Sequence, residues 1–107
     1  MKEEKRRREI LKEMTRIDCM EKGRLTEEYR ERYKGGKKVR LGPYYKHQRW
    51  EDGRNMSRRV SVAEVERMRK AVDGYHQFEK LAKEYAQITI QMTRQSKADE
   101  DSKKKPR

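Results

Sequence analysis

The stretch RWEDGRNMSRRVSVAE, residues 49–64, decides the expected fold of this chain. At its centre, Asp52-Gly53 is a pair that readily adopts the positive φ angles of a two-residue type I′ hairpin turn. Strand-like residues flank the pair on both sides. Ser61 and Glu64 then form a capping box, in which the Ser61 hydroxyl caps a helix and Glu64 reaches back to the Ser61 N–H. The stretch therefore predicts a hairpin that leads directly into a helix.

Weaker strand signals precede this hairpin. Leu25, Tyr29 and Tyr33 fall on one side of an alternating pattern, and Gly35-Gly36 marks a turn after them. Residues 39–50 are rich in aromatic and β-branched side chains, which favour strands. We expect a two- or three-stranded antiparallel sheet.

One helix is predicted before the sheet in the chain, and another is predicted after it. Residues 2–22 contain neither Gly nor Pro, and Gly23 stands where a helix C-cap would be. A narrow apolar stripe runs along this segment and consists of Ile10, Leu11, Met14 and Ile17.

The second helix should run from Ser61 to about Gln95. At about 100° per residue, the apolar stripes of its two halves point about 140° apart. Either this helix kinks near Gly74, or its halves have different partners: the sheet for the first half, and the first helix or another subunit for the second.

The predicted fold class is α+β, with an N-terminal helix, a small antiparallel sheet, a long C-terminal helix and a disordered basic tail. The corresponding segments are 1–22 for the basic N-terminal helix, 23–95 for the sheet and long helix, and 96–107 for the tail. Hydrophobic residues make up only 31% of the chain and charged residues 47%, so one thin core is expected.

The charge balance indicates a polyanionic partner. Lys and Arg number 31 against 19 Asp and Glu, for a formal net charge of +12. Nucleic acid fits best, because each cation on a phosphate also releases condensed counterions. DNA and RNA remain open. A membrane surface ranks last, since the apolar positions do not form a broad Trp, Phe and Leu edge.

Several other functions are not expected. Cys19 is the only cysteine, which excludes an intramolecular disulfide and a Cys-based zinc site and suits a reducing cytoplasm. The two histidines, His47 and His76, lie in different predicted elements, so neither a metal site nor a cofactor is predicted. A chain this short cannot enclose a catalytic centre around its tyrosines, so we do not expect an enzyme.

The densest basic and aromatic stretch, residues 34–59, is the predicted nucleic-acid site. Alternate strand residues point to opposite faces, and we expect Tyr44 and Trp50 to supply core while Tyr45, His47 and Arg49 face solvent. Tyr45 and His47 would then stack on bases, and Arg58-Arg59 would meet phosphate near the helix start. The alternative is that the aromatics form the core and the cations maintain solubility. The predicted binding residues are Lys37, Lys38, Arg40, Tyr45, Lys46, His47, Arg49, Arg54, Arg58 and Arg59.

A second predicted surface lies on the long helix. Its heptad-like run is typical of a coiled-coil seam, which would join two copies or dock on a larger protein such as a transposase. The alternative is an intramolecular pairing with Ile10, Met14 and Ile17. The run consists of Phe78, Leu81, Tyr85, Ile88 and Met92.

The order of motifs over residues 22–95 carries a resemblance. Leu41-Gly42-Pro43-Tyr44-Tyr45 precedes the hairpin with Trp50, Gly53 and Arg54, and a Ser-Arg-Arg-Val strand at 57–60 leads into a helix with Tyr75, Phe78 and Leu81. This order resembles a small uncharacterised prokaryotic domain often encoded beside transposases. The resemblance implies a mobile-element setting and no particular activity. Many members have a Cys-containing knuckle before the Gly-Pro-Tyr-Tyr strand, whereas residues 32–37 here contain no cysteine, so the resemblance implies no metal knuckle.

Overall fold

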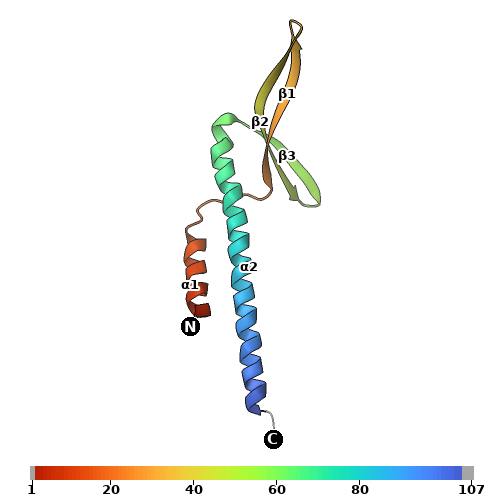
Figure 1. The fold of residues 1–107 in the computed structure, drawn as a ribbon. Helices are drawn as coiled ribbons and strands as arrows, with labels where there is room; N and C mark the ends of the chain where they lie inside the picture. The colour runs from red at the N-terminus through yellow and green to blue at the C-terminus, as the bar shows by residue number, and fades with distance from the viewer. Residues whose placement is uncertain (1, 105–107) are drawn as a thin grey trace. The chain divides into compact units, whose positions relative to one another are not determined.

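The computed structural model describes residues 2–104, with side chains as far as residue 100. Helix α1 (Lys2–Thr15) is followed by strands β1 (Arg24–Lys34), β2 (Lys37–Glu51) and β3 (Arg54–Val60), and then by helix α2 (Val62–Lys104). Figure 1 shows these elements along the chain. The predicted α+β class is confirmed: along the chain, one helix precedes an antiparallel sheet and one helix follows it.

The sheet has three strands in the order β1-β2-β3, and both neighbouring pairs are antiparallel. The turn between β2 and β3 has φ angles of 52° at Asp52 and 74° at Gly53, as the Asp-Gly pair predicts. Gly35 and Gly36, at 58° and 78°, close the β1–β2 hairpin in the same way. Both turns predicted from glycine are therefore confirmed.

Helix α2 starts where the sequence predicts it, directly after Ser61. The Ser61 hydroxyl donates to the Glu64 carboxylate at 3.2 Å, and the Glu64 N–H donates to the Ser61 carbonyl oxygen at 3.0 Å. The predicted capping box is not observed among the described residues: the Ser61 hydroxyl and the Glu64 carboxylate bond to each other and not to backbone N–H groups.

Helix α1 is shorter than the predicted 2–22. It ends at Thr15, and its last turn closes with bonds from Arg16 N to Glu13 O and from Ile17 N to Met14 O. The following segment uses its backbone elsewhere: Glu21 N–H donates to the Ala71 carbonyl at 2.9 Å in α2. A helix extended to residue 22 would lose this bond, which is the physical reason for the earlier end.

Helix α2 is continuous through Gly74 and extends to Lys104, so the kink considered at Gly74 does not interrupt it. It includes residues 96–104, where the sequence predicts a disordered tail; residues 105–107 of that tail lie outside the described residues.

The two halves of α2 belong to different compact units. One unit, which we call the sheet unit, is Cys19–Tyr75. The other, which we call the helical unit, joins the residues before Cys19 to those from His76 onward. This division agrees with the second of the two alternatives, in which the first half of α2 belongs with the sheet and the second half with the first helix.

Each unit has a small core of its own. In the sheet unit, the buried side chains are Val60, His47 and two residues one heptad apart on α2, Val65 and Val72. In the helical unit, Ile10 of α1 is fully buried and Leu81 of α2 is nearly so. This thin apolar core agrees with the 31% hydrophobic content of the chain.

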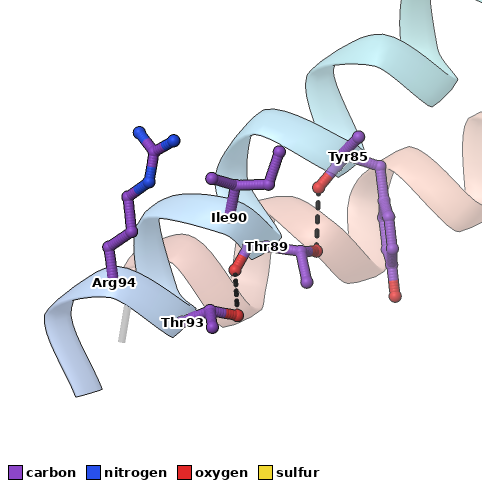
Figure 2. Close-up of a pocket in the computed structure, with 6 residues that line it drawn as sticks. Tyr85, Thr89, Ile90, Thr93 and Arg94 are labelled. Atoms are coloured by element: carbon purple, nitrogen blue, oxygen red, sulfur yellow. Dashed lines mark hydrogen bonds between the residues drawn. The ribbon is translucent and has the colours of Figure 1, made fainter. Parts of the chain in front are cut away.

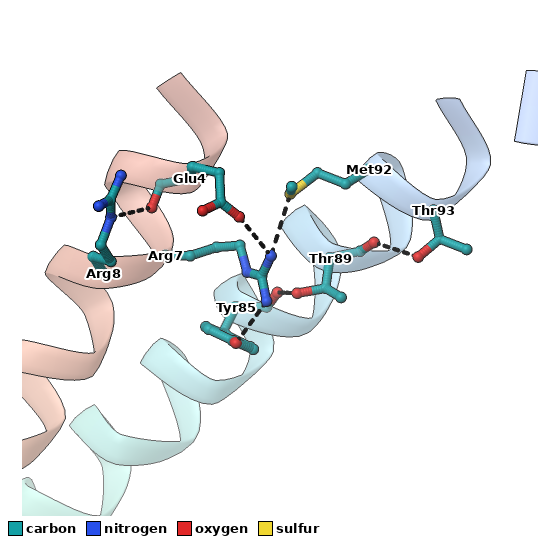
Figure 3. A network of polar contacts seen from close by, with 7 residues as sticks. All are labelled: Glu4, Arg7, Arg8, Tyr85, Thr89, Met92 and Thr93. Carbon is teal, nitrogen blue, oxygen red and sulfur yellow. Dashed lines mark hydrogen bonds and ion pairs between the residues drawn. The ribbon is translucent and has the colours of Figure 1, made fainter. Parts of the chain in front are cut away.

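Polar contacts supplement the core of the helical unit. The Arg6 guanidinium forms a two-pronged ion pair with Glu84, with N···O distances of 2.6 and 2.9 Å. Figure 3 shows Arg7 reaching from α1 to α2, where it donates to the Tyr85 hydroxyl at 2.8 Å and to the Met92 sulfur at 3.6 Å. Its guanidinium also lies 4.8 Å from the centroid of the Tyr85 ring.

Candidate nucleic-acid interface

Strand alternation divides the sheet into two faces. The register pairs Tyr45 with Val60 and His47 with Arg58, so these residues share one face, which we call the inner face because it carries buried Val60 and His47. We call the opposite side the open face. Its residues are Arg24, Thr26, Glu28, Arg30, Arg32 and Lys34 on β1; Lys37, Val39, Leu41, Tyr44, Lys46, Gln48 and Trp50 on β2; and Asn55, Ser57 and Arg59 on β3.

A bulge keeps the open face continuous along β2. Glu28 pairs with Tyr44 and Arg30 with Leu41, so β2 has one more residue than β1 between these pairs. The bulge contains the cis Gly42-Pro43 bond, and Gly42 has a φ of 127°. Leu41 and Tyr44 consequently lie on the same side. The Arg30 guanidinium, 5.2 Å from the centroid of the Tyr44 ring, confirms that Arg30 and Tyr44 share this side.

Three of the five cations on the inner face of the strands, Lys38, Arg49 and Arg58, form ion pairs. Lys38 lies 2.8 Å from Glu31, Arg49 lies 2.6 Å from Glu51, and Arg58 lies 3.6 Å from Glu64 of α2. The Arg49 hydrogen bond lowers the pKa of the Glu51 carboxyl below its ordinary value. The guanidinium of Arg40 lies over the Tyr29 ring at 3.8 Å from its centroid. Carboxylates therefore offset the charge of three inner-face cations, while Arg40 has a ring contact and Arg54 has no ion pair among the residues whose side chains are described.

Cations on the open face have no carboxylate partner among the residues whose side chains the structure describes. Along the strands, which are described in full, Glu28 is the only acidic residue on this face. Arg30 and Arg59 flank the Tyr44 ring at 5.2 and 5.1 Å from its centroid. Together with Lys46, Ser57 and Glu28, they line a hollow of about 170 Å³, so three cations face one acidic residue there. The open face therefore presents positive charge that the fold itself does not neutralise.

Trp50 gives the open face an exposed aromatic surface. Its side chain is 69% exposed, and it lines a second hollow of about 360 Å³ with Arg24, Gln48 and Asn55. An exposed large aromatic beside arginine is typical of surfaces that stack on nucleic-acid bases.

The sequence-based assignment of the two faces is wrong. His47, expected to face solvent, is only 1% exposed, and its Nε2 donates to the Lys22 carbonyl oxygen at 2.7 Å. Tyr45 pairs with buried Val60 and is half-buried. Trp50, expected in the core, is exposed. The physical reason is that Val60 is the apolar residue that β3 buries, and the register places Tyr45 and His47 on its side.

This reversal divides the predicted binding residues between the faces. Lys37, Lys46 and Arg59 lie on the open face. Arg58 on the inner face is paired with Glu64, which leaves the phosphate site predicted at the helix start without that cation. The predicted residues that lie on the inner face are Lys38, Arg40, Tyr45, His47, Arg49, Arg54 and Arg58.

Sequence reasoning missed part of the open face. Arg24, Arg30, Arg32 and Lys34 on β1 were not predicted to take part. The signal that identifies the faces is present in the sequence: a two-residue turn at Asp52-Gly53 pairs Glu51 with Arg54, and counting outward pairs Tyr45 with Val60.

A separate apolar hollow lies on the second half of α2. Figure 2 shows it lined by Tyr85, Thr89, Ile90, Thr93 and Arg94, where both threonine hydroxyls donate to backbone oxygens one turn earlier. Its volume is about 500 Å³, and Ile90 is 47% exposed.

The predicted seam on α2 differs from this hollow, although Tyr85 belongs to both. Leu81 is buried within the helical unit, while Phe78, Tyr85, Ile88 and Met92 are half-buried. Arg7 of α1 contacts two of these residues, Tyr85 and Met92. The intramolecular pairing therefore occupies part of the seam.

No family model matches this chain, and no curated protein or solved structure is significantly similar to it. A search of the described residues for a helix long and apolar enough to cross a membrane found none. Within the same residues, no cluster of His, Cys, Asp and Glu has the grouping that a metal ion needs.

Proposed function

We propose that this protein binds nucleic acid through the open face of its sheet, mainly by phosphate contacts. The observation that carries the proposal is the charge asymmetry between the faces. On the inner face, carboxylates pair with Lys38, Arg49 and Arg58, whereas the open-face cations have no carboxylate partner among the described residues. Unneutralised cations beside exposed Trp50 suit phosphate contact combined with base stacking. The resemblance to transposase-linked domains adds an accessory role in a mobile element to this proposal.

The test compares two triple variants that remove the same charge from opposite faces. Arg24→Ala/Lys46→Ala/Arg59→Ala removes open-face cations, and Lys38→Ala/Arg49→Ala/Arg58→Ala removes inner-face cations. Binding to labelled oligonucleotides is measured over a salt series. The open-face variant should bind roughly tenfold or more weakly, with a salt slope reduced by about 0.9 for each phosphate that the variant no longer neutralises. Equal losses of affinity in both variants, or no binding by the unmodified protein, would overturn the proposal.

Docking on a larger protein is the second candidate function. The hollow beside Ile90 favours it, because an exposed isoleucine next to about 500 Å³ of apolar space can receive a partner side chain. Ile90→Asp should abolish co-purification with a larger partner protein such as a transposase and leave nucleic-acid binding intact. Thr93→Asp, at the rim of the same hollow, serves as a second variant. Retained co-purification by both variants would exclude this surface.

A further inference from the structure

The β1–β2 hairpin projects beyond the third strand as a two-stranded ribbon. β3 pairs with β2 only between Tyr45 and Glu51, so the ladder from Arg30–Leu41 to Lys34–Lys37 has no third strand (Figure 1). At about 3.4 Å per residue, this ladder is about 14 Å long. Both of its faces meet solvent, and burying apolar side chains does not account for its length.

The two faces of the ribbon differ in charge. On its open face lie Arg30, Arg32, Lys34 and Lys37, and no described residue forms an ion pair with the last three. On its reverse face, Glu31 pairs with Lys38, and Tyr29 lies against Arg40. The one carboxylate in this ladder therefore points away from the open face and is already paired.

We infer that this ribbon enters the major groove of duplex DNA with its open face toward the bases. The inference rests on the proposed function and names its substrate class. A B-form major groove is about 12 Å wide and about 8.5 Å deep, and it admits a two-stranded ribbon. Two strands about 4.8 Å apart fit within that width, and the ribbon's length of about 14 Å then lies along the groove. Its open-face cations come from both strands, so they reach the phosphates on both sides of the groove.

The remaining side chains on the ribbon's open face fit the same surroundings. Val39 and Leu41 lie there between the cations, and apolar side chains contact the methyl group of thymine in the major groove. The turn at the tip consists of Gly35 and Gly36, which have no side chains, so it presents only backbone. The space around both residues is open, since a Cβ on either would have no neighbour within 4 Å. Duplex RNA is a poorer fit, because the major groove of A-form helices is deep and narrow.

The first experiment compares binding to a duplex DNA, a duplex RNA of the same sequence and the single DNA strand. Two matched variants each lose one arginine and one lysine from the ribbon: Arg32→Ala/Lys37→Ala from its open face, and Lys38→Ala/Arg40→Ala from its reverse face. The unmodified protein should prefer duplex DNA by roughly tenfold or more. Only the open-face variant should lose this preference. In that variant, the slope of the logarithm of the binding constant against the logarithm of the salt concentration should also become shallower by about two.

Two further measurements address the position of the ribbon. In dimethyl sulfate footprinting, the protein should protect guanine N7, which lies in the major groove. A shortened ribbon, made by deleting residues 32–33 and 38–39, keeps the alternation and the Gly35-Gly36 turn and should abolish this protection. Circular dichroism verifies that the shortened chain is folded.

The outcomes separate this inference from the proposed function. If all three nucleic acids bind equally well and the Arg32→Ala/Lys37→Ala variant behaves like its reverse-face control, the ribbon does not enter the groove, while binding through the open face stands. Protection of adenine N3 in the minor groove would also overturn the inference. If none of the three nucleic acids binds, both proposals fail.

Discussion

His47 Nε2 donates a hydrogen bond to the carbonyl oxygen of Lys22 over 2.7 Å, which links the chain entering β1 to the middle of β2. A carbonyl can only accept, so Nε2 carries the proton and Nδ1 is left as a buried nitrogen without a protein partner. A residue that the sequence places among nucleic-acid contacts therefore has a structural role in this fold.

Replacing His47 should destabilise the sheet unit. His47→Ala leaves the Lys22 carbonyl without its donor and opens a cavity in a thin core. The free energy of unfolding should therefore fall by about 2–4 kcal/mol. Urea unfolding followed by circular dichroism measures this loss, with exposed Ser57→Ala as the control. A midpoint equal to that of the unmodified protein would contradict the structural role. In addition, ¹⁵N NMR should show the proton on Nε2.

Gly23→Ala should be more harmful than a substitution at the other positive-φ glycines. Gly23 has a φ of 95°, and a Cβ there would overlap the backbone carbonyl of Gln48. The expected loss of stability exceeds about 1 kcal/mol. Gly53→Asn is the matched control, because Gly53 at φ 74° faces open space and asparagine tolerates this conformation. Similar thermal midpoints for the two variants would show that Gly23 is not constrained by Gln48.

The Arg6–Glu84 pair should make packing of the helical unit depend on pH. The hydrogen bond from Arg6 lowers the pKa of the Glu84 carboxyl below its ordinary value of 4.5. A group with a lowered folded-state pKa stabilises the protein above its ordinary pKa, and this contribution disappears as the pH falls through the folded-state value.

Thermal unfolding of Glu84→Gln measures this effect. The variant should be less stable than the unmodified protein at neutral pH, and the two should converge in acid below the lowered pKa. Glu66→Gln, an exposed carboxylate on the same helix, should follow the unmodified protein at every pH. A constant difference between Glu84→Gln and the unmodified protein down to strong acid would contradict the ion-pair explanation.

Trp50 should report nucleic-acid binding directly. It is the only tryptophan in the chain, and its 69% exposure gives it the red-shifted emission of a hydrated indole. Stacking on a base should quench this emission, and Trp50→Ala should weaken single-strand binding by about 1–3 kcal/mol per stacked base. Tyr33→Ala is the control, because Tyr33 is 75% exposed and lies on the reverse face of the ribbon. Unchanged emission at saturating oligonucleotide would exclude Trp50 from the interface.

Local residue chemistry determined much of this fold. Asp52-Gly53 and Gly35-Gly36 adopt positive φ angles in their turns, and the helix predicted after Ser61 begins at Val62. The apolar spacing of α2 also indicated two partners, because its stripes diverge along the helix axis. All of these signals act over a few residues, so they can be read without knowing the rest of the chain.

Tertiary structure decided which face of the sheet is buried and where α1 ends. An aromatic strand such as 44–50 offers apolar surface on both sides, and only its register against Val60 selects His47 for the interior and leaves Trp50 exposed. Likewise, α1 stops at Thr15 and Glu21 further along the chain bonds to Ala71, far away in sequence. Cross-strand burial and long-range backbone bonds overrode local propensity at both places. As a result, the candidate binding surface lies on the side of the sheet opposite to the one that the sequence predicted.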